Sequence, residues 1–257
     1  MAPSEDKIFL KNNIIQSLIS ENSSKIQAQL VEAIRYMVRE DFPSQWPDML
    51  NSVFAMLASA DTKAIKAGIM VASILSYWRV LDDQEDARSA MISSLFNALL
   101  PIANELLKGD TEESYLLLKT ILKSYQRSIQ YTMPKCLREA NCMAGWCTVF
   151  VRVLLEKSNP AIPCTLDNEK NPFWKMKKWA LHCLNHIFAK YGAPDRRDNY
   201  GGEYQEFCKF YMTHVFEKVY SSYMQMAQLY SAARTKREPL NMTAKMRHLL
   251  YDYLSTW

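Results

Sequence analysis

Apolar residues recur every three or four positions along most of this 257-residue chain, which is the spacing of one face of an α-helix. No strand-rich region competes with this pattern. It predicts ten helices, at residues 6–20, 24–40, 46–58, 62–80, 86–106, 112–131, 137–157, 173–191, 203–233 and 240–257. We therefore expect an all-α fold.

The segment 41–50 separates the second and third predicted helices and has the composition of a corner. Pro43 ends the preceding helix, because proline lacks a backbone N–H and disfavours helical geometry in the residue before it. Ser44 is the predicted N-cap of the next helix, and Pro47 is placed in its first turn, where a missing N–H has no partner to lose. Trp46 supplies a large apolar anchor. Such a corner is typical of stacked helix pairs rather than of an enzyme pocket.

The ten helices combine into five pairs, and the first three pairs begin about 40 residues apart. This spacing matches the HEAT and armadillo repeats, whose period is roughly 40–47 residues. The predicted fold is an α-solenoid of about five HEAT repeats, which forms a right-handed superhelical arc with residues 1–257 as a single segment. The predicted pairs are 6–40, 46–80, 86–131, 137–191 and 201–257. An irregular helical bundle is the alternative.

Two features interrupt the helical pattern. Pro101 lies inside the fifth predicted helix and should kink or split it. Residues 158–171 contain two prolines and no helical period, so they form the longest predicted loop.

The composition argues against several classes of function. Six glycines leave little room for phosphate loops or dinucleotide fingerprints. P-loop, serine-hydrolase and zinc-protease motifs are absent, so we expect neither an enzyme nor a bound cofactor. The net charge of +4 neither demands nor excludes a nucleic-acid partner. No apolar run reaches the length of a membrane span. The six cysteines form no C-x-x-C pair, and this pattern favours reduced thiols in the cytosol or nucleus.

A basic strip runs along the helix predicted at 173–191. Its members recur every three or four residues and so share one face: Lys175, Lys178, His182, His186 and Lys190. No acidic residue lies among them. We expect the strip to contact an acidic partner surface or phosphate groups, and a solvated polar face is the alternative. The two histidines lack an intervening glutamate and a third ligand, so we expect no metal site there.

An acidic cluster precedes the fifth predicted helix and consists of Asp82, Asp83, Glu85 and Asp86. Acids at this position favour a helix N-terminus through the helix dipole. The alternative is a docking point for the basic patches of a cargo protein.

Three segments resemble a known family. Asp41-Phe42-Pro43-Ser44-Gln45-Trp46-Pro47-Asp48-Met49-Leu50 resembles the link between the third and fourth HEAT repeats of nuclear transport receptors of the importin-β superfamily. Trp174-Lys175-Met176-Lys177-Lys178-Trp179-Ala180, with Tyr191-Gly192 after it, is similar to a stretch of the importin 7 and 8 branch. Tyr131-Thr132-Met133-Pro134 also fits that branch, and the resemblance runs from about Ile8 to Trp257.

The resemblance implies a receptor without catalytic activity that shuttles between cytoplasm and nucleus. Such receptors bind protein cargo, in this branch basic cargo such as ribosomal proteins or histones, and release it when Ran-GTP binds. They also contact phenylalanine-glycine nucleoporins, usually between outer helices. Arg35, Arg39 and the basic strip are the candidates for the inner surface. The first two repeats of the family and its C-terminal part are expected to lie outside this sequence.

Two other functions stay open. The chain could belong to a Ran-independent HEAT scaffold for protein or ribonucleoprotein assembly, or to a helical repeat that binds RNA through the basic strip. Ran binding that is stronger with GTP than with GDP separates the first alternative from transport. A steep loss of RNA affinity with salt would favour the second.

Overall fold

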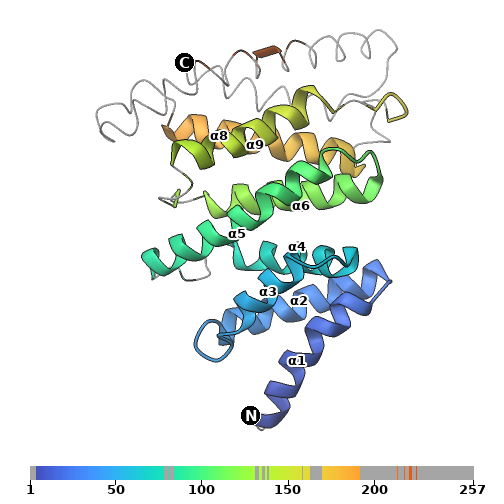
Figure 1. Ribbon diagram of the computed structural model, residues 1–257, viewed down its shortest axis with the longest axis vertical. Coiled ribbons are helices and arrows are strands. Elements are labelled where there is room, and N and C mark those ends of the chain that lie inside the picture. The colour runs from blue at the N-terminus through green and yellow to red at the C-terminus, as the bar shows by residue number, and fades with distance from the viewer. Residues whose placement is uncertain are drawn as a thin grey trace. The chain divides into compact units, whose positions relative to one another are not determined.

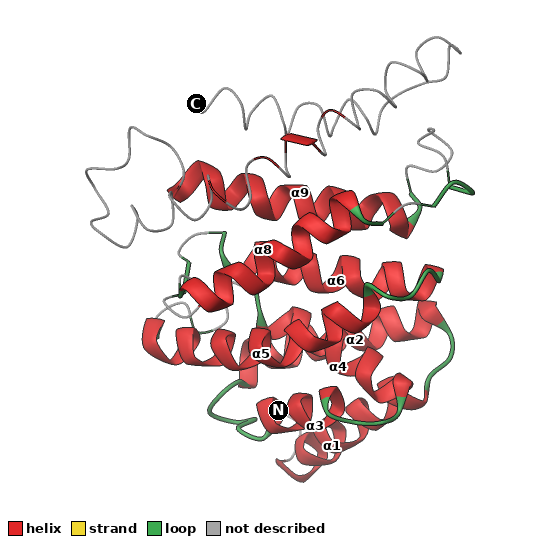
Figure 2. Ribbon diagram, turned by 45° about the horizontal axis from the view of Figure 1, so that its top comes forward, coloured by secondary structure: helices red, strands yellow, loops and turns green. Residues whose placement is uncertain are grey.

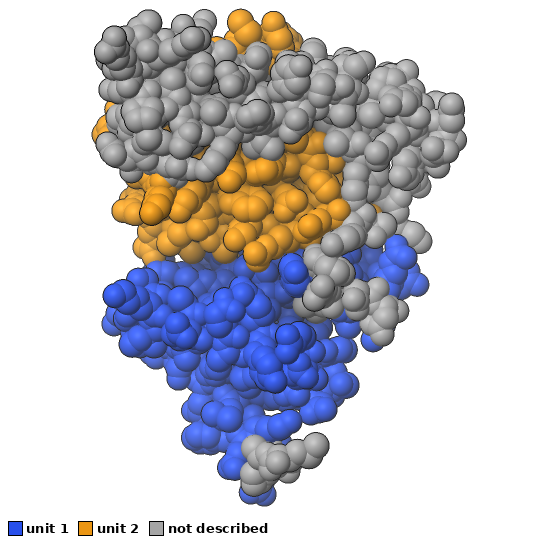
Figure 3. All heavy atoms as spheres, turned by 180° about the vertical axis from the view of Figure 1, so that it is seen from behind, with its two compact units in different colours: residues 1–99 blue, residues 100–257 orange. Residues whose placement is uncertain are grey.

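The protein is described from a computed structural model, and it divides into two compact units, residues 1–99 and 100–257 (Figure 3). The residues that the structure describes are 4–77, 81, 84–130, 133–134, 137, 139–157, 159–162 and 170–191, with the single positions 213, 217, 220, 221 and 224. The predicted fifth pair, 201–257, lies outside the described residues except at those single positions.

Helices are the only regular secondary structure among the described residues (Figures 1 and 2). Unit 1 contains α1 (Ser4–Ser20), α2 (Ser24–Asp41), α3 (Met49–Leu57) and α4 (Thr62–Leu75). The unit boundary falls within α5 (Glu85–Leu106), and unit 2 continues with α6 (Glu112–Ser128), α8 (Ala140–Leu155) and α9 (Pro172–Tyr191). None of the helices in the described part of the chain combines the length and apolar character needed to cross a bilayer.

Within each unit, neighbouring helix pairs stack on one another. In unit 1, α1 packs on α2 and α3 on α4, while α4 also packs on both helices of the first pair. In unit 2, α8 packs on α9, and α9 packs on α6 of the preceding pair. This arrangement is typical of HEAT repeats, in which each unit buries its apolar face on the next. The all-α prediction is confirmed, and the division into five pairs stays a prediction.

At the corner between α2 and α3, the N-cap position of α3 is held by a different residue from the predicted one. The helix α3 begins at Met49, with Asp48 at its N-cap position, and Ser44 is exposed. The prediction that Ser44 caps this helix is wrong, because the chain first makes a turn in which the Gln45 N–H donates to the Asp41 carbonyl at 2.7 Å.

Lys11 of α1 clamps this corner from the neighbouring helix. Its Nζ atom lies 2.8 Å from a carboxylate oxygen of Asp41 and donates to the Gln45 carbonyl at 2.8 Å. The ammonium group also lies 5.7 Å from the centroid of the Trp46 ring, which is buried as predicted. Pro47 precedes α3 rather than entering its first turn, so that part of the prediction is wrong.

The helix α5 runs through Pro101 without a break and ends at Leu106, so of the two predicted effects of this proline a split is wrong, and a kink stays a prediction. Pro101 is exposed. The carbonyl group that loses its intrahelical donor belongs to Asn97, which is also exposed, so water can replace that hydrogen bond.

Aromatic side chains build the contact between α6 and α8 in the core of unit 2. The Tyr125 ring lies 5.1 Å from the Trp146 ring and 5.0 Å from the Phe150 ring, and all three side chains are buried. On α8, Gly145 lies against α5, because a Cβ atom there would be only 2.9 Å from a methyl group of Leu100. The absence of a side chain thus lets the two helices approach closely.

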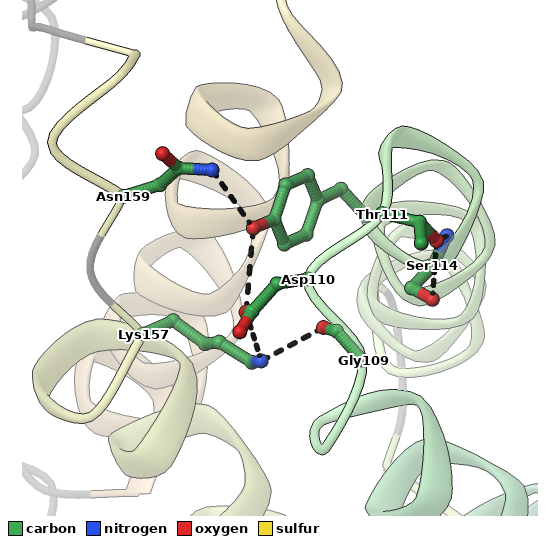
Figure 4. A network of polar contacts seen from close by, with 7 residues as sticks. Gly109, Asp110, Thr111, Ser114, Lys157 and Asn159 are labelled. Carbon is green, nitrogen blue, oxygen red and sulfur yellow. Dashed lines mark hydrogen bonds and ion pairs between the residues drawn. The ribbon is translucent and has the colours of Figure 1, made fainter.

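A second buried lysine joins the two helix pairs of unit 2 (Figure 4). Lys157 Nζ, just after α8, donates to the Gly109 carbonyl at 2.8 Å and pairs with an Asp110 carboxylate oxygen at 2.7 Å. The Tyr115 hydroxyl donates to the same carboxylate at 3.4 Å and accepts from the Asn159 amide at 3.2 Å. The hydrogen bond from Lys157, and then its charge, lower the pKa of Asp110 below 3.8. The turn after α5 is therefore tied to the loop after α8.

We predict that Lys157→Met destabilises the chain by about 2 kcal/mol, because the Gly109 carbonyl loses a charged donor that is almost fully buried. The matched control is Lys108→Met, which removes only an exposed pair with Glu105 and should change stability by less than about 0.5 kcal/mol. Urea unfolding of both variants measures the difference. Equal stability of the two variants would mean that the contacts of Lys157 with Gly109 and Asp110 do not stabilise the fold.

Candidate partner-binding site

The site begins with the packing of α6 along α9, the second helices of two neighbouring pairs (Figure 1). Three contacts fix their register: Tyr115 with Phe173 at 5.1 Å between ring centroids, Cys183 Sγ with the Leu122 carbonyl at 3.3 Å, and His186 Nε2 with the Ile129 carbonyl at 2.9 Å. From the first contact to the third, the residue number rises along α6 and along α9 together. The two helices therefore run parallel, which places their side chains in a fixed order.

Local sequence sets where both helices begin. The Thr111 hydroxyl caps α6 by accepting a hydrogen bond from the Ser114 N–H at 3.1 Å. At the start of α9, the Asn171 side chain accepts from the Phe173 N–H at 2.9 Å. Pro172 is the first helical residue, a position where proline costs no hydrogen bond. The two starts bring Tyr115 and Phe173 together.

Four half-buried lysines from the two helices form what we call the lysine cluster, made of Lys119 and Lys123 on α6 and Lys175 and Lys178 on α9. Burial, and then the charges of Lys175 and Lys123, lower the pKa of Lys119 below its usual 10.5. The Lys123 ammonium group lies 5.5 Å from the ring centroid of Trp179 on α9. The cluster therefore bridges both helices and concentrates like charges.

His182 belongs to the same surface but carries no charge at neutral pH. Burial, followed by the charges of Lys178 and His186, lowers the pKa of His182 from 6.5 to about 4. Its ring lies 5.3 Å from the Trp179 ring. The positive charge of this surface at neutral pH therefore comes from the lysines and not from this imidazole.

No acidic residue in the described part of the chain neutralises Lys119, Lys175 or Lys178. None of the three forms an ion pair or a hydrogen bond with another described residue. By contrast, Lys177 on the same helix is buried and donates to the Leu154 carbonyl at 2.8 Å. Packing thus separates a structural lysine from lysines that face outward.

The predicted basic strip is only part of this surface. Lys175, Lys178 and His182 lie on it, His186 contacts the Ile129 carbonyl, and the side chain of Lys190 lies outside the described residues. Sequence reasoning missed Lys119 and Lys123. Their spacing of four residues on one helix was visible, but it does not reveal which helix they face.

The other predicted partner-binding residues lie elsewhere. Arg35 is exposed and pairs with Glu32 at 2.5 Å, one turn earlier on α2. Arg39 is exposed, pairs with Glu40 at 2.9 Å, and has its guanidinium 5.0 Å from the Tyr36 ring centroid. Both cations therefore already have neighbouring partners on their own helix.

Two of the four predicted acidic residues are described. Glu85 and Asp86 are exposed in the first turn of α5, where they complement the helix dipole. Asp82 and Asp83 lie outside the described residues.

Residues that could hold a metal ion do not gather in the described part of the chain, where no three His, Cys, Asp or Glu side chains meet. The three described cysteines, Cys142, Cys147 and Cys183, form no disulfide bond. Burial raises the pKa of Cys147 to about 12 and raises that of Cys183 well above 9.0. Both thiols are therefore protonated and unreactive at neutral pH.

Unit 1 has a groove of about 490 Å³ between α1 and α3, next to the corner. Its lining includes Ile8, Ile15, Ile19 and Trp46. Ile8 is 59% exposed at the rim, whereas Trp46 is only 7% exposed. The lining also includes polar residues such as Lys11, Gln16 and Ser52, so the groove combines apolar and polar walls with an open entrance.

Comparison with known proteins finds similar sequences that cover almost the whole chain. Importin-8 of Mus musculus is 26% identical over 253 residues, which is 92% of this chain and 24% of that protein. The probable importin-7 homolog of Dictyostelium discoideum is 24% identical over 242 residues, which is 91% of this chain and 23% of that protein. The chain is therefore similar, over about nine tenths of its length, to proteins of the importin 7/8 branch of the importin-β superfamily.

A similarity to an exportin covers a shorter part of the chain. Exportin-2 of Homo sapiens is 28% identical over 110 residues, which is 38% of this chain and 11% of that protein. No family model matches the chain. The chain spans about a quarter of the length of the importins that it matches. These relatives are nuclear transport receptors, and the stacked helix pairs agree with their HEAT-repeat solenoid.

Proposed function

We propose that the chain is a segment of a nuclear transport receptor that binds protein cargo and Ran-GTP and carries cargo through the nuclear pore without catalysis. The observation that carries the proposal is the similarity to importins over 92% of the chain. Stacked helix pairs with parallel α6 and α9 support it, because a solenoid offers a long surface rather than a pocket for chemistry. A shuttling receptor works in both cytoplasm and nucleus.

The proposed mechanism is a choice between partners. Each helix pair touches only its neighbours, so a solenoid of such pairs can change curvature through small adjustments at each interface. If Ran-GTP and cargo favour different curvatures, each lowers the affinity of the receptor for the other. Basic cargo, such as ribosomal proteins or histones, would need acidic surfaces of the receptor. The described residues Glu85 and Asp86 are candidates for one such contact.

We place the contact with phenylalanine-glycine nucleoporins at the groove between α1 and α3. These are the first helices of two neighbouring pairs, and the walls of the groove include three isoleucines and the buried Trp46 beside polar residues such as Lys11 and Gln16. A phenylalanine side chain is apolar and flat, so it fits between such walls and gains the free energy of burial.

The alternative is a Ran-independent HEAT scaffold for protein or ribonucleoprotein assembly. The same stacked pairs would serve it equally well, since the fold alone does not choose between partners. The response to Ran separates the two functions.

We predict that the full-length receptor binds Ran-GTP at least about tenfold more tightly than Ran-GDP, and that Ran-GTP lowers its affinity for a histone by a similar factor. Titration calorimetry with each nucleotide state, in the presence and absence of histone, measures both effects. Equal affinity for the two forms of Ran, or independent binding of Ran and histone, would favour the scaffold.

We further predict that Ile8→Glu weakens binding of a synthetic phenylalanine-glycine repeat peptide by about tenfold, because a carboxylate at the rim cannot pack on phenylalanine. Leu10→Glu is the matched control. Leu10 is 55% exposed on the same helix and does not line the groove. Fluorescence anisotropy gives both affinities. An equal effect of the two substitutions would exclude the groove as the docking site.

A further inference from the structure

The lysine cluster holds several positive charges close together, and the described part of the chain does not neutralise Lys119, Lys175 or Lys178. Lys119 lies half-buried beside Lys175 and Lys123, and the three positive charges repel one another. Lys119, Lys175 and Lys178 have no acidic partner among the described residues. Like charges held close together and partly removed from water raise the free energy of the folded state. An anionic ligand would relieve this repulsion.

We propose that the lysine cluster on α6 and α9 is a docking site for an acidic peptide segment of a partner protein. The cluster is the complement of carboxylate side chains, and it would repel the basic cargo expected for the relatives of this chain. This inference does not rest on the transport proposal, because it concerns the charge of one surface and holds equally for a scaffold.

The spacing of the lysines fits an extended acidic peptide. Lys119 and Lys123 are four residues apart on α6, which is about 6 Å along the helix axis. Every second residue of an extended chain is about 6.7 Å further along and points to the same side. A peptide with glutamate or aspartate at alternate positions can therefore place one carboxylate near each ammonium group of α6.

The surface fits a peptide better than RNA. Single-stranded RNA is held by open aromatic faces together with cations. Here Trp174 is buried and donates its indole N–H to the Ile162 carbonyl at 3.1 Å. Trp179 is half-buried, with the Lys123 ammonium group and the His182 ring close to it. Trp174 therefore offers no face for base stacking, and the Lys123 ammonium group already lies over the ring of Trp179, which leaves the lysines as the main means of recognition.

The first test measures binding of a labelled ten-residue peptide of alternating glutamate and serine to the full chain at low salt. A peptide with glutamine in place of glutamate is the ligand control. The double variant Lys175→Glu/Lys178→Glu should weaken binding by at least about tenfold. The matched variant Lys7→Glu/Lys25→Glu changes net charge equally at exposed positions of α1 and α2 and should retain binding.

A second variant separates binding from folding. Because the pKa of Lys119 is lowered in the folded chain, the unfolded chain holds that proton more tightly, and the charge opposes folding at neutral pH. Lys119→Met should therefore raise the melting temperature while it weakens peptide binding. A residue with a merely structural role would lose stability and binding together.

Several results would overturn the proposal. The wild-type chain could fail to bind the alternating peptide, or the site and control variants could lose peptide affinity equally. A lower melting temperature for Lys119→Met would also contradict it. Tighter binding of a ten-nucleotide oligouridine, lost in Lys175→Glu/Lys178→Glu, would assign the site to RNA instead. Should the double reversal not fold, Lys175→Gln/Lys178→Gln gives the same comparison with a smaller perturbation. A normal Ran response with no peptide binding would reject this inference and leave the transport proposal intact.

Discussion

The parallel packing of α6 on α9 is the constraint on which the interpretation of this protein depends. Contacts near the start, middle and end of the two helices hold one register. That register decides that Lys119 meets Lys175 and that Lys123 lies on Trp179. A shift of one turn would separate these side chains, because positions on a helix repeat every 3.6 residues. The charge of the candidate surface is thus a consequence of how two apolar faces pack.

Lysine has two distinct uses in this structure. Lys11, Lys157 and Lys177 are buried, and each donates to a backbone carbonyl group. Gln45 and Gly109 lie in turns between helices, and Leu154 lies at the end of α8. Carbonyl groups in turns and in the last turn of a helix have no intrahelical donor, so a charged donor there stabilises the turn or helix end and joins it to a neighbouring segment. The lysine cluster has no such acceptor for three of its members among the described residues. The proposed ligand would supply the opposite charge for Lys119, Lys175 and Lys178.

Helical periodicity was enough to predict the all-α fold and the position of every described helix within a few residues. It failed at the corner, where Ser44 has the right chemistry for a cap but the turn delays α3 until Met49. It also could not distinguish Lys177 from Lys175 and Lys178, which look alike in sequence but differ in burial. Lys119 and Lys123 escaped prediction because their neighbours on α9 lie more than fifty residues away, and packing alone sets that register.

The direct measurement of this account is the titration of the Lys119 side chain, followed by NMR of its Cε and Nζ atoms. The account predicts a pKa below 10.5, because burial and the charges of Lys175 and Lys123 oppose protonation. It also predicts that the pKa of Lys119 rises in Lys175→Gln, which removes one of those charges across the helix interface. An ordinary pKa that does not respond to Lys175→Gln would mean that the two helices do not bring these lysines together.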